Sequence, residues 1–395
     1  MKIKLIILFL LSLIQSGFAQ SRIEEILKEI SVNNLQIKAG SELVKAKRSE
    51  FNIGLAPNDP FFNFDYLFGS PKKFGNQTEF SVIFSFDFPT VYGKKSNLAD
   101  MRSTQLNYDE HSLKQLVLLE AKLTLIDLVY LNKKNAELNE RYITANRIYD
   151  YFSIRLQQGD VNIMDVNKAK LQVINFKSEL ELNKTEINKL NSKLTEFNGG
   201  KIVFFADTTY PFMDELPDFS SLETEIESSD PVLKKLNLQY KISRQEIDLH
   251  KELRLPKIEL GYRYQGLLDQ NFNGFHAGIS IPLWEKNYTV SSKELQAKYT
   301  KSLIEEHKNE HYYEIKQLYE QCVSLGSTIA ETKELFSSIS NYELYEKAFL
   351  LGEISSIEYL MEITYYYNIK DKISSMELEY HKIYTSLFRN RLTNQ

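Results

Sequence analysis

Residues 94–158 contain neither glycine nor proline over 65 positions, and this run constrains the chain more than any other feature. Proline removes a helix hydrogen bond, and glycine leaves the backbone too free. At a rise of 1.5 Å per residue, an uninterrupted helix here would be roughly 100 Å long. Such a helix has no core of its own and must pack along other helices. The sequence therefore predicts long antiparallel helical hairpins.

A second run, over residues 286–351, contains no proline and only one glycine, Gly326. Pro89 and Pro282 each end a short pleated segment, and Gly159 and Gly352 each follow a long helical run. The members of both pairs are 193 residues apart, and their flanking patterns match. A constant offset between two landmarks predicts an internal duplication.

The first residues have the pattern of a signal peptide, which we place at residues 1–19. Lys2 and Lys4 give a positive start, residues 6–14 are apolar, and small residues end the segment at Ala19. The apolar run is too short to span a bilayer as a helix, which argues against a membrane anchor.

Charge and cysteine content argue against a nucleic-acid-binding protein and against a disulfide-bonded fold. Without Lys2 and Lys4, the 48 basic residues fall to 46, against 53 acidic ones. This balance argues against a nucleic-acid partner, because phosphate backbones are bound by clustered basic charge. Cys322 is the only cysteine, so no disulfide forms within the chain.

The rest of the chain divides into two copies joined by an acidic connector that contains prolines. Each copy is predicted to contain a helix, a β-hairpin, a long helix and a shorter returning helix. The predicted boundaries are 20–200 for the first copy, with its hairpin over 60–89 and its tip near Gly159; 201–231 for the connector; and 232–395 for the second copy, with its hairpin over 256–282 and its tip near Gly352. Within the connector, residues 202–205 are predicted to form a strand.

The hairpins alternate apolar and polar residues with a period of two, which places the two sets on opposite faces of a sheet. Each strand is roughly ten residues long, which is the length and pattern of a transmembrane β-strand. The alternative is a soluble sheet with one face on a core, but no nearby apolar element would cover so many rings. The residues expected to face lipid are Phe80, Phe84, Phe86, Phe88, Tyr262, Tyr264, Ile279 and Ile281.

The number of strands predicts an oligomer. Open sheet edges are not tolerated in lipid, and the smallest usual barrel has eight strands. Four strands per chain therefore require several chains. Three chains would give a 12-stranded outer-membrane β-barrel, and the same symmetry would wrap the long helices into a trimeric α-barrel.

Several stretches resemble the outer-membrane efflux channel family, the TolC-like proteins. They are the run from Gly278 to Trp284 followed by Asn287, and the two helix turns at residues 155–169 and 351–360. The resemblance covers nearly the whole mature chain. It implies a homotrimer in the outer membrane of a Gram-negative-type cell, with helices that project into the periplasm. It also implies a passive duct of a tripartite efflux or type I secretion system, docked on a periplasmic adaptor (membrane fusion protein) and an inner-membrane pump.

The family closes its periplasmic entrance with inward-facing carboxylates and hydrogen bonds at the tips. The resemblance places Glu358 in an acidic ring after Gly352, with Asp165 as its counterpart beside Gly159 and Arg155 in the first tip. Like charges on a narrow axis would repel anions and attract cations. The alternative is an ordinary carboxylate at a helix N-terminus, which the helix dipole favours.

The sequence departs from the family at two positions near this ring. Ile354 stands where some members have a basic lock residue, and Met361 stands where a second acidic residue can occur. These departures argue against a strong polar lock and against a double acidic ring.

Residues 307–311 read His-Lys-Asn-Glu-His, which formally matches an inverted zinc-protease signature. Two histidines four residues apart share one helix face and could hold zinc. However, the pair lies within a long helix rich in glutamate and lysine, and no third ligand is evident. We interpret it as a solvated helix face and predict no metal site. No phosphate loop, nucleophile elbow or nucleotide fingerprint is present, so we predict neither enzymatic activity nor a cofactor.

A second class of function fits the same patterns. A periplasmic coiled-coil scaffold or adaptor would use the long helices to bind partners and the strands as a soluble cap. The two hypotheses differ in whether the apolar strand faces meet lipid.

Overall fold

The computed structural model describes residues 22–268, 270–280, 287–339 and 342–393, so the predicted signal peptide lies outside it. The chain forms two compact units. One comprises Met1–Lys38, Leu113–Ser229 and Tyr312–Gln395, and we call it the helical unit; the other, the sheet unit, comprises Ala39–Ser112 and Asp230–His311. Each predicted sequence copy contributes residues to both units, so the copies are not the compact units.

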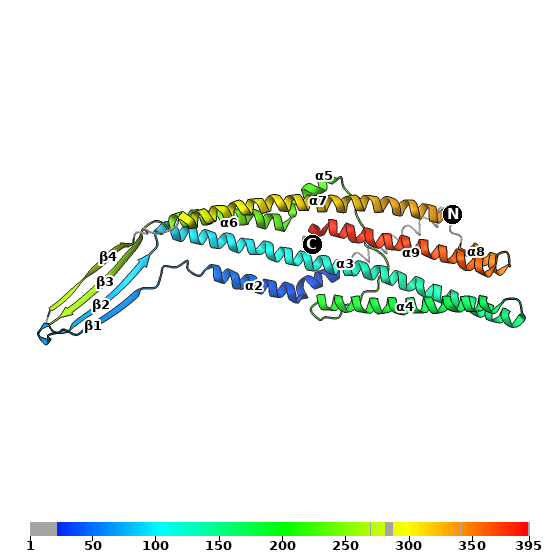
Figure 1. Cartoon of the computed structure of the whole chain (residues 1–395), viewed down its shortest axis with the longest axis horizontal. Coiled ribbons are helices and arrows are strands. Elements are labelled where there is room, and N and C mark those ends of the chain that lie inside the picture. Colours follow the sequence, from blue (N-terminus) through cyan, green and yellow to red (C-terminus); the bar gives the residue numbers. More distant parts are fainter. Residues whose placement is uncertain (1–21, 269, 281–286, 340–341, 394–395) are drawn as a thin grey trace. The chain divides into compact units, whose positions relative to one another are not determined.

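The helices agree closely with the predicted runs (Figure 1). A helix over residues 22–33 comes first. The others are α2 (Leu35–Phe51), α3 (Pro89–Gln158), α4 (Ile163–Phe197), α5 (Phe219–Ser229), α6 (Pro231–Glu252), α7 (Asn287–Ile339), α8 (Tyr342–Leu350) and α9 (Ser356–Leu387), followed by the short 3-10 helix η2 (Arg389–Thr393). The second predicted long run is described as α7 and α8, and residues 340–341 lie outside the described range.

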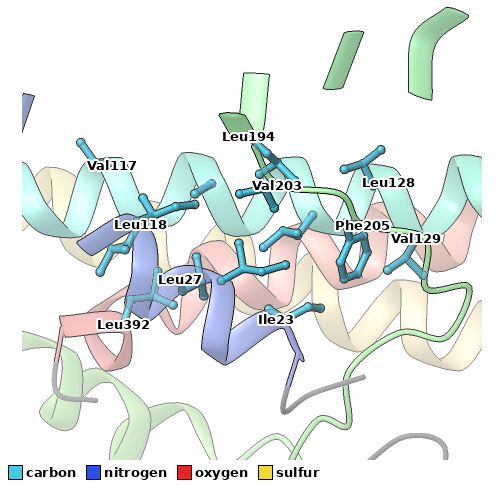
Figure 2. Close-up of a cluster of buried hydrophobic side chains, with 14 residues drawn as sticks. Ile23, Leu27, Val117, Leu118, Leu128, Val129, Leu194, Val203, Phe205 and Leu392 are labelled. Carbon is cyan, nitrogen blue, oxygen red and sulfur yellow. The ribbon is translucent and has the colours of Figure 1, made fainter. Parts of the chain in front are cut away.

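The helical unit has its main core where the first helix meets α3 and the end of α4. Figure 2 shows this cluster, with Ile23, Leu27, Val117, Leu118, Leu128, Val129, Leu194, Val203, Phe205 and Leu392 labelled. Ile30, Ala121 and Leu125 at its centre are fully buried. Full burial of a large aliphatic side chain is worth about 1.5–3 kcal/mol, so this cluster supplies the core that one long helix lacks.

The predicted strand over residues 202–205 is wrong. The segment is extended but belongs to no sheet. Val203 and Phe205 are 6% and 1% exposed, whereas Ile202 and Phe204 are 90% and 69% exposed. The alternation is therefore real, but it arises because the segment lies on α4: the backbone amide of Phe205 donates to Asn191 Oδ1 at 3.1 Å.

The connector, for which the sequence predicts one short strand and no helix, also contains a helix, α5. Asp218 starts it, because its carboxylate accepts a hydrogen bond from the Ser221 amide at 3.1 Å. Leu222 and Ile226, four residues apart, are buried in a second core of the helical unit that includes Ile315 of α7 and Ile383 of α9. This helical spacing is present in the sequence, and the prolines that flank it obscure the pattern.

The sheet unit contains one four-stranded antiparallel sheet in the order β1-β2-β3-β4 (Figure 1). The strands are β1 (Phe61–Leu67), β2 (Gln77–Phe86), β3 (Lys257–Leu267) and β4 (Gln270–Ser280). Both predicted hairpins are thus confirmed, and β2 pairs with β3 to join them.

The helices of the sheet unit are joined by a buried charge. Glu246 of α6 accepts hydrogen bonds from Arg102 of α3 at 2.6 Å and from Lys293 of α7 at 2.7 Å. Burial opposes ionisation of Glu246, but Lys293 and Arg102 hold its pKa below the usual value.

Among the described residues, none of the helices combines the length and the hydrophobicity that a membrane crossing requires.

We expect Phe205→Ala to lower the free energy of unfolding of the helical unit by about 3–5 kcal/mol, because the substitution leaves a cavity in a fully buried cluster. The adjacent Phe204→Ala is a matched control, since Phe204 is largely exposed. Urea unfolding of the detergent-solubilised protein, followed by helical circular dichroism, measures both. Equal effects of the two substitutions would contradict the packing described for this segment.

Candidate functional site: the sheet faces and the helix turns

The strand register places the predicted apolar residues on one face of the sheet. Phe80 lies opposite Phe64 of β1 and Tyr264 of β3. Residues paired across antiparallel strands have side chains on the same face, and the period of two extends that face along each strand. The face therefore includes Phe62, Phe64, Tyr66, Phe80, Val82, Phe84, Phe86, Ile258, Leu260, Tyr262, Tyr264, Phe275, Ala277 and Ile279.

One of the residues predicted to face lipid is not on this face. Phe88 follows the end of β2 and packs instead against Val91, Leu98 and Ile242, in a helical core of the sheet unit. The alternation that predicted its position stops at Phe86, where the strand ends. Ile281 lies outside the described residues.

The opposite face of the sheet is polar and carries a hydrogen-bonded network. Glu79 of β2 accepts from Arg263 at 2.7 Å and from Gln265 at 2.9 Å, both on β3. On β3 and β4, Glu259 Oε2 and His276 Nε2 lie 3.9 Å apart. One sheet thus presents aromatic and aliphatic groups on one side, and on the other side hydrogen-bonding groups together with Phe61, Ile83 and Phe272.

The two predicted tips are both sharp turns at a glycine. Gly159 follows α3 with φ +81°, and Gly352 follows α8 with φ +75°. In each turn, the glycine amide bonds back three residues and the next amide bonds back five residues, which is the Schellman pattern that ends a helix. Residues other than glycine rarely adopt this backbone conformation, so the glycines allow the chain to reverse.

Each turn leads into a helix whose first turn is capped in the same way. Asn162 Oδ1 accepts from the Asp165 amide at 3.1 Å at the start of α4. At the start of α9, Ser355 Oγ accepts from the Glu358 amide at 3.3 Å. The two capping residues, and the two acidic residues, are again 193 positions apart.

Glu358 completes a capping box with Ser355. Its carboxylate accepts from the Ser355 backbone amide at 2.8 Å. The hydrogen bonds from Ser355 lower the pKa of Glu358 below its usual value. Glu358 is exposed, so within one chain its role is to cap α9, and its charge is available to surrounding solvent.

The two turns lie together in the helical unit, around an aromatic cluster. The ring of Phe349 from α8 lies 5.7 Å from that of Tyr151, 5.5 Å from that of Phe152 and 4.6 Å from that of Tyr359. Phe152 and Tyr359 are fully buried. Packing at these distances adds about 0.5–1.5 kcal/mol per ring pair beyond the buried area, so the cluster holds the two turns as one structure.

The remaining predicted tip residues make local contacts. Arg155 donates to the Tyr151 hydroxyl at 3.0 Å and lies 3.4 Å from Asp160, both in the first turn region. Ile354 packs against the aromatic cluster, whereas Met361 is exposed. Ile354 therefore contributes apolar packing where a basic residue would form a polar lock.

Sequence reasoning missed two charged groups that tie the long helices together. Arg141 of α3 has a side chain only 5% exposed and binds Asp371 of α9 through two hydrogen bonds of 2.6 and 2.9 Å. Glu377 of α9 accepts from Lys133 at 2.8 Å and lies 2.5 Å from Lys333. Although burial opposes its charge, these lysines lower the pKa of Glu377. Arg141 and Asp371 are 230 residues apart and Lys133 and Glu377 are 244 apart, so no local sequence spacing reveals these two pairs.

The interpretation of the histidine pair as a solvated helix face is wrong for His311, which is buried. A third potential ligand is also present, because Asp230 lies 2.6 Å from His307. Asp230 precedes His307 by 77 residues, so nothing in the local motif indicates it. Glu310, the acid of the protease signature, is exposed and does not belong to this group.

Structural comparison finds the same architecture in solved outer-membrane proteins. The open state of the Neisseria gonorrhoeae MtrE outer membrane channel is 13% identical in sequence, with a TM-score of 0.72 over 94% of this chain and 89% of MtrE. The Campylobacter jejuni CmeC outer membrane channel is also 13% identical, with a TM-score of 0.67 over 94% of this chain and 84% of CmeC. This chain has the fold of an outer-membrane channel.

CusC, whose crystal structures concern folding and transmembrane channel formation, shares that channel fold at 12% identity, with a TM-score of 0.72 over 95% of this chain and 91% of CusC. No family model and no curated protein sequence matches the chain. The resemblance inferred from the two turns and the strand before Pro282 is thus confirmed at the level of the fold. In this channel fold, the sheet faces and the paired turns are the two candidate functional regions.

We expect Ser355→Ala to fray the start of α9, because it removes one half of the capping box at a cost of about 1 kcal/mol. Hydrogen exchange over residues 355–362 measures this as faster exchange at pH 7. The part contributed by the lowered pKa of Glu358 is complete above its usual pKa of 4.5 and is lost as the pH falls through the lowered value. Glu353→Ala, at an exposed position in the turn before the cap, is the neighbouring control. Exchange that is unchanged in Ser355→Ala would show that the capping box contributes nothing.

Proposed function

We propose that this chain is one subunit of a homotrimeric outer-membrane channel, the passive exit duct of a tripartite efflux or type I secretion system. The single observation that carries the proposal is the four-stranded sheet with one apolar face and one polar face, in a chain with an outer-membrane channel fold. Lipid would cover the apolar face, and the polar face with Glu79 and Arg263 would line an aqueous lumen.

The sheet edges support assembly from several copies. Among the described strands, β1 and β4 each have a hydrogen-bonded neighbour on one side only. Unpaired edges are not tolerated in lipid, so each β1 would pair with the β4 of another copy. Three copies give twelve strands, which is above the usual minimum of eight. The same threefold symmetry would surround a common axis with the long helices.

The channel architecture would arise from an internal duplication. The offset of 193 residues relates the strand-ending prolines, the glycines of the turns and, in the structure, the residues that cap α4 and α9. Equivalent hydrogen bonds at equivalent positions support a repeated structural unit.

The region of the paired turns is proposed to dock on a periplasmic adaptor protein attached to an inner-membrane pump. Beside α8, the helical unit has a groove of about 360 Å³ between α7 and α9. Leu335, Ile339 and Tyr365 in its lining are exposed apolar side chains. An exposed apolar groove of this kind is typical of a protein-binding surface. In this arrangement the pump would supply energy and select the substrate.

Glu358 is proposed to serve in the gate as well as in the cap. Its carboxylate is exposed and, because of Ser355, remains ionised to lower pH than usual. Three copies around an axis would form a ring of negative charge that favours cations. Asp165 would be the matching acidic residue of the first turn.

The channel proposal predicts a particle of three chains. It also predicts that an arginine is tolerated on the polar face of the sheet and not on the apolar face. Purified from outer membranes in detergent, the protein should have a mass near three mature chains, roughly 130 kDa without detergent. Phe84→Arg should impair assembly, because a basic side chain on the lipid face of a barrel is destabilising, by up to about 2–4 kcal/mol at the midplane and by less near the strand ends. The neighbouring Ser85→Arg, on the polar face, should assemble normally.

Analytical ultracentrifugation and membrane fractionation measure these outcomes together. A monomer in the soluble periplasmic fraction would overturn the channel and favour a scaffold whose strands form a soluble cap. Equal tolerance of both arginine substitutions would equally exclude lipid from the apolar face.

Glu358→Gln tests the gate proposal, because it removes the negative charge of residue 358 while the side chain can still cap α9. Glutamine can still accept from the Ser355 amide, so α9 should remain intact. The loss of three negative charges should lower the preference for cations in planar-bilayer conductance recordings. The exposed Glu353→Gln, in the turn itself, is the control. An unchanged ion preference in Glu358→Gln, with α9 intact, would leave Glu358 with its capping role alone.

A further inference from the structure

Asp230, His307 and His311 converge inside the sheet unit. Asp230 is the residue that caps α6, and one of its oxygens, Oδ1, accepts from the Val232 amide at 2.8 Å. Its other oxygen, Oδ2, lies 2.6 Å from His307 Nε2 and 3.9 Å from His311 Nδ1. One oxygen of the carboxylate therefore caps α6, and the other faces the histidines of α7.

The two histidines are presented together by the geometry of α7. They are four residues apart, which places them on one face of a helix about one turn apart. Their rings lie 5.4 Å apart with an angle of 20° between the ring planes. The three ligand atoms, one from each side chain, all lie within 4.8 Å of one another.

Burial distinguishes this group from charged residues on a solvated helix. The side chain of Asp230 is 6% exposed, that of His311 is 10% exposed and that of His307 is 22% exposed. Placing a carboxylate and two imidazoles out of water is costly unless their polar atoms are satisfied. The hydrogen bond between Asp230 and His307 joins one imidazole to the carboxylate, and His311 Nδ1 faces the same Asp230 oxygen across 3.9 Å.

We propose that Asp230, His307 and His311 bind one divalent transition-metal ion, with zinc as the best match. Two imidazole nitrogens and one carboxylate oxygen form a common set of three protein ligands for zinc. Magnesium and calcium prefer sites made of oxygen alone. Around a tetrahedral zinc ion with bonds of about 2.0–2.2 Å, neighbouring ligand atoms are separated by roughly 3.3 Å. The contact with His307 would therefore lengthen, and the contact with His311 would shorten, each by less than about 1 Å.

The bound ion would fasten the start of α6 to α7. Asp230 and His311 are the first and last residues of the second segment of the sheet unit, so the metal would link the two ends of that segment. Three protein ligands leave a fourth position for water or another small ligand. Because Glu310 of the protease signature is exposed, we assign the ion a structural role. The inference is independent of the channel proposal, since it uses this one chain alone.

Titration of the metal-free, full-length protein with Co²⁺ tests the site, because tetrahedral Co²⁺ with nitrogen ligands absorbs visible light. We expect one bound Co²⁺ per chain, displaced by Zn²⁺. Asp230→Asn should weaken binding by at least about tenfold, since loss of even a supporting residue costs 10–100-fold. Asparagine caps helices as well as aspartate does, so α6 should stay folded. His311→Ala should have the same effect on binding.

His276→Ala is the control, because His276 lies on the sheet near Glu259 and outside the cluster. Zinc should also raise the midpoint of thermal unfolding of the native chain and of this control, but not that of Asp230→Asn. Failure of the native protein to bind Co²⁺ in a tetrahedral site would overturn the proposal. Binding that persists unchanged in Asp230→Asn and His311→Ala would equally overturn it, because the ion would then be held elsewhere.

Discussion

A helix of 70 residues such as α3 cannot stabilise itself, and the structure depends on what covers it. In the helical unit, one part of α3 contributes Ala121 and Leu125 to the main core, and its end contributes Phe152 to the aromatic cluster of the turns. Arg141, between these two clusters, is anchored to Asp371 of α9. Apolar packing and buried charge thus alternate along one helix. Because Arg141 is buried, loss of Asp371 would leave its guanidinium without its bidentate partner, so such pairs fix which helices are neighbours even where they add little net stability.

The elements that could be predicted from sequence are those encoded by local rules. A period of two located the hairpins, and the absence of glycine and proline located the long helices to within a few residues. The glycines at 159 and 352 located the turns, because the reversal needs their positive φ. The same local rule misled at residues 202–205, since an extended chain that packs on α4 alternates in the same way as a strand. The packed segment differs from a strand in its hydrogen-bond partner: the Phe205 amide donates to the side chain of Asn191 on α4 and not to another strand.

The candidate sites were predictable only as far as they are local. The resemblance to the channel family suggested Glu358 as a gate residue, and its position near a predicted helix N-terminus gave the alternative of an ordinary helix-terminal carboxylate. The structure adds that Ser355 and Glu358 satisfy each other, so the capping role is complete within one chain. The proposed gate would need the Glu358 carboxylates of two other copies, so a single chain cannot show it. By contrast, Asp230 and His307 are related by folding alone, and their separation of 77 residues carries no local signal.

The two roles of Asp230 have a further consequence. A carboxylate that caps a helix is held in place by the backbone, so its second oxygen has little freedom to move. A flexible ligand side chain loses conformational entropy when it binds an ion, and a side chain that is already held in place loses less. His307 and His311 lie on one face of α7, with their rings 5.4 Å apart. The group is therefore organised before any ion arrives, whereas a simple contact between α6 and α7 would need only one histidine. Preorganisation of three ligands is what favours a metal site over a hydrogen-bonded link.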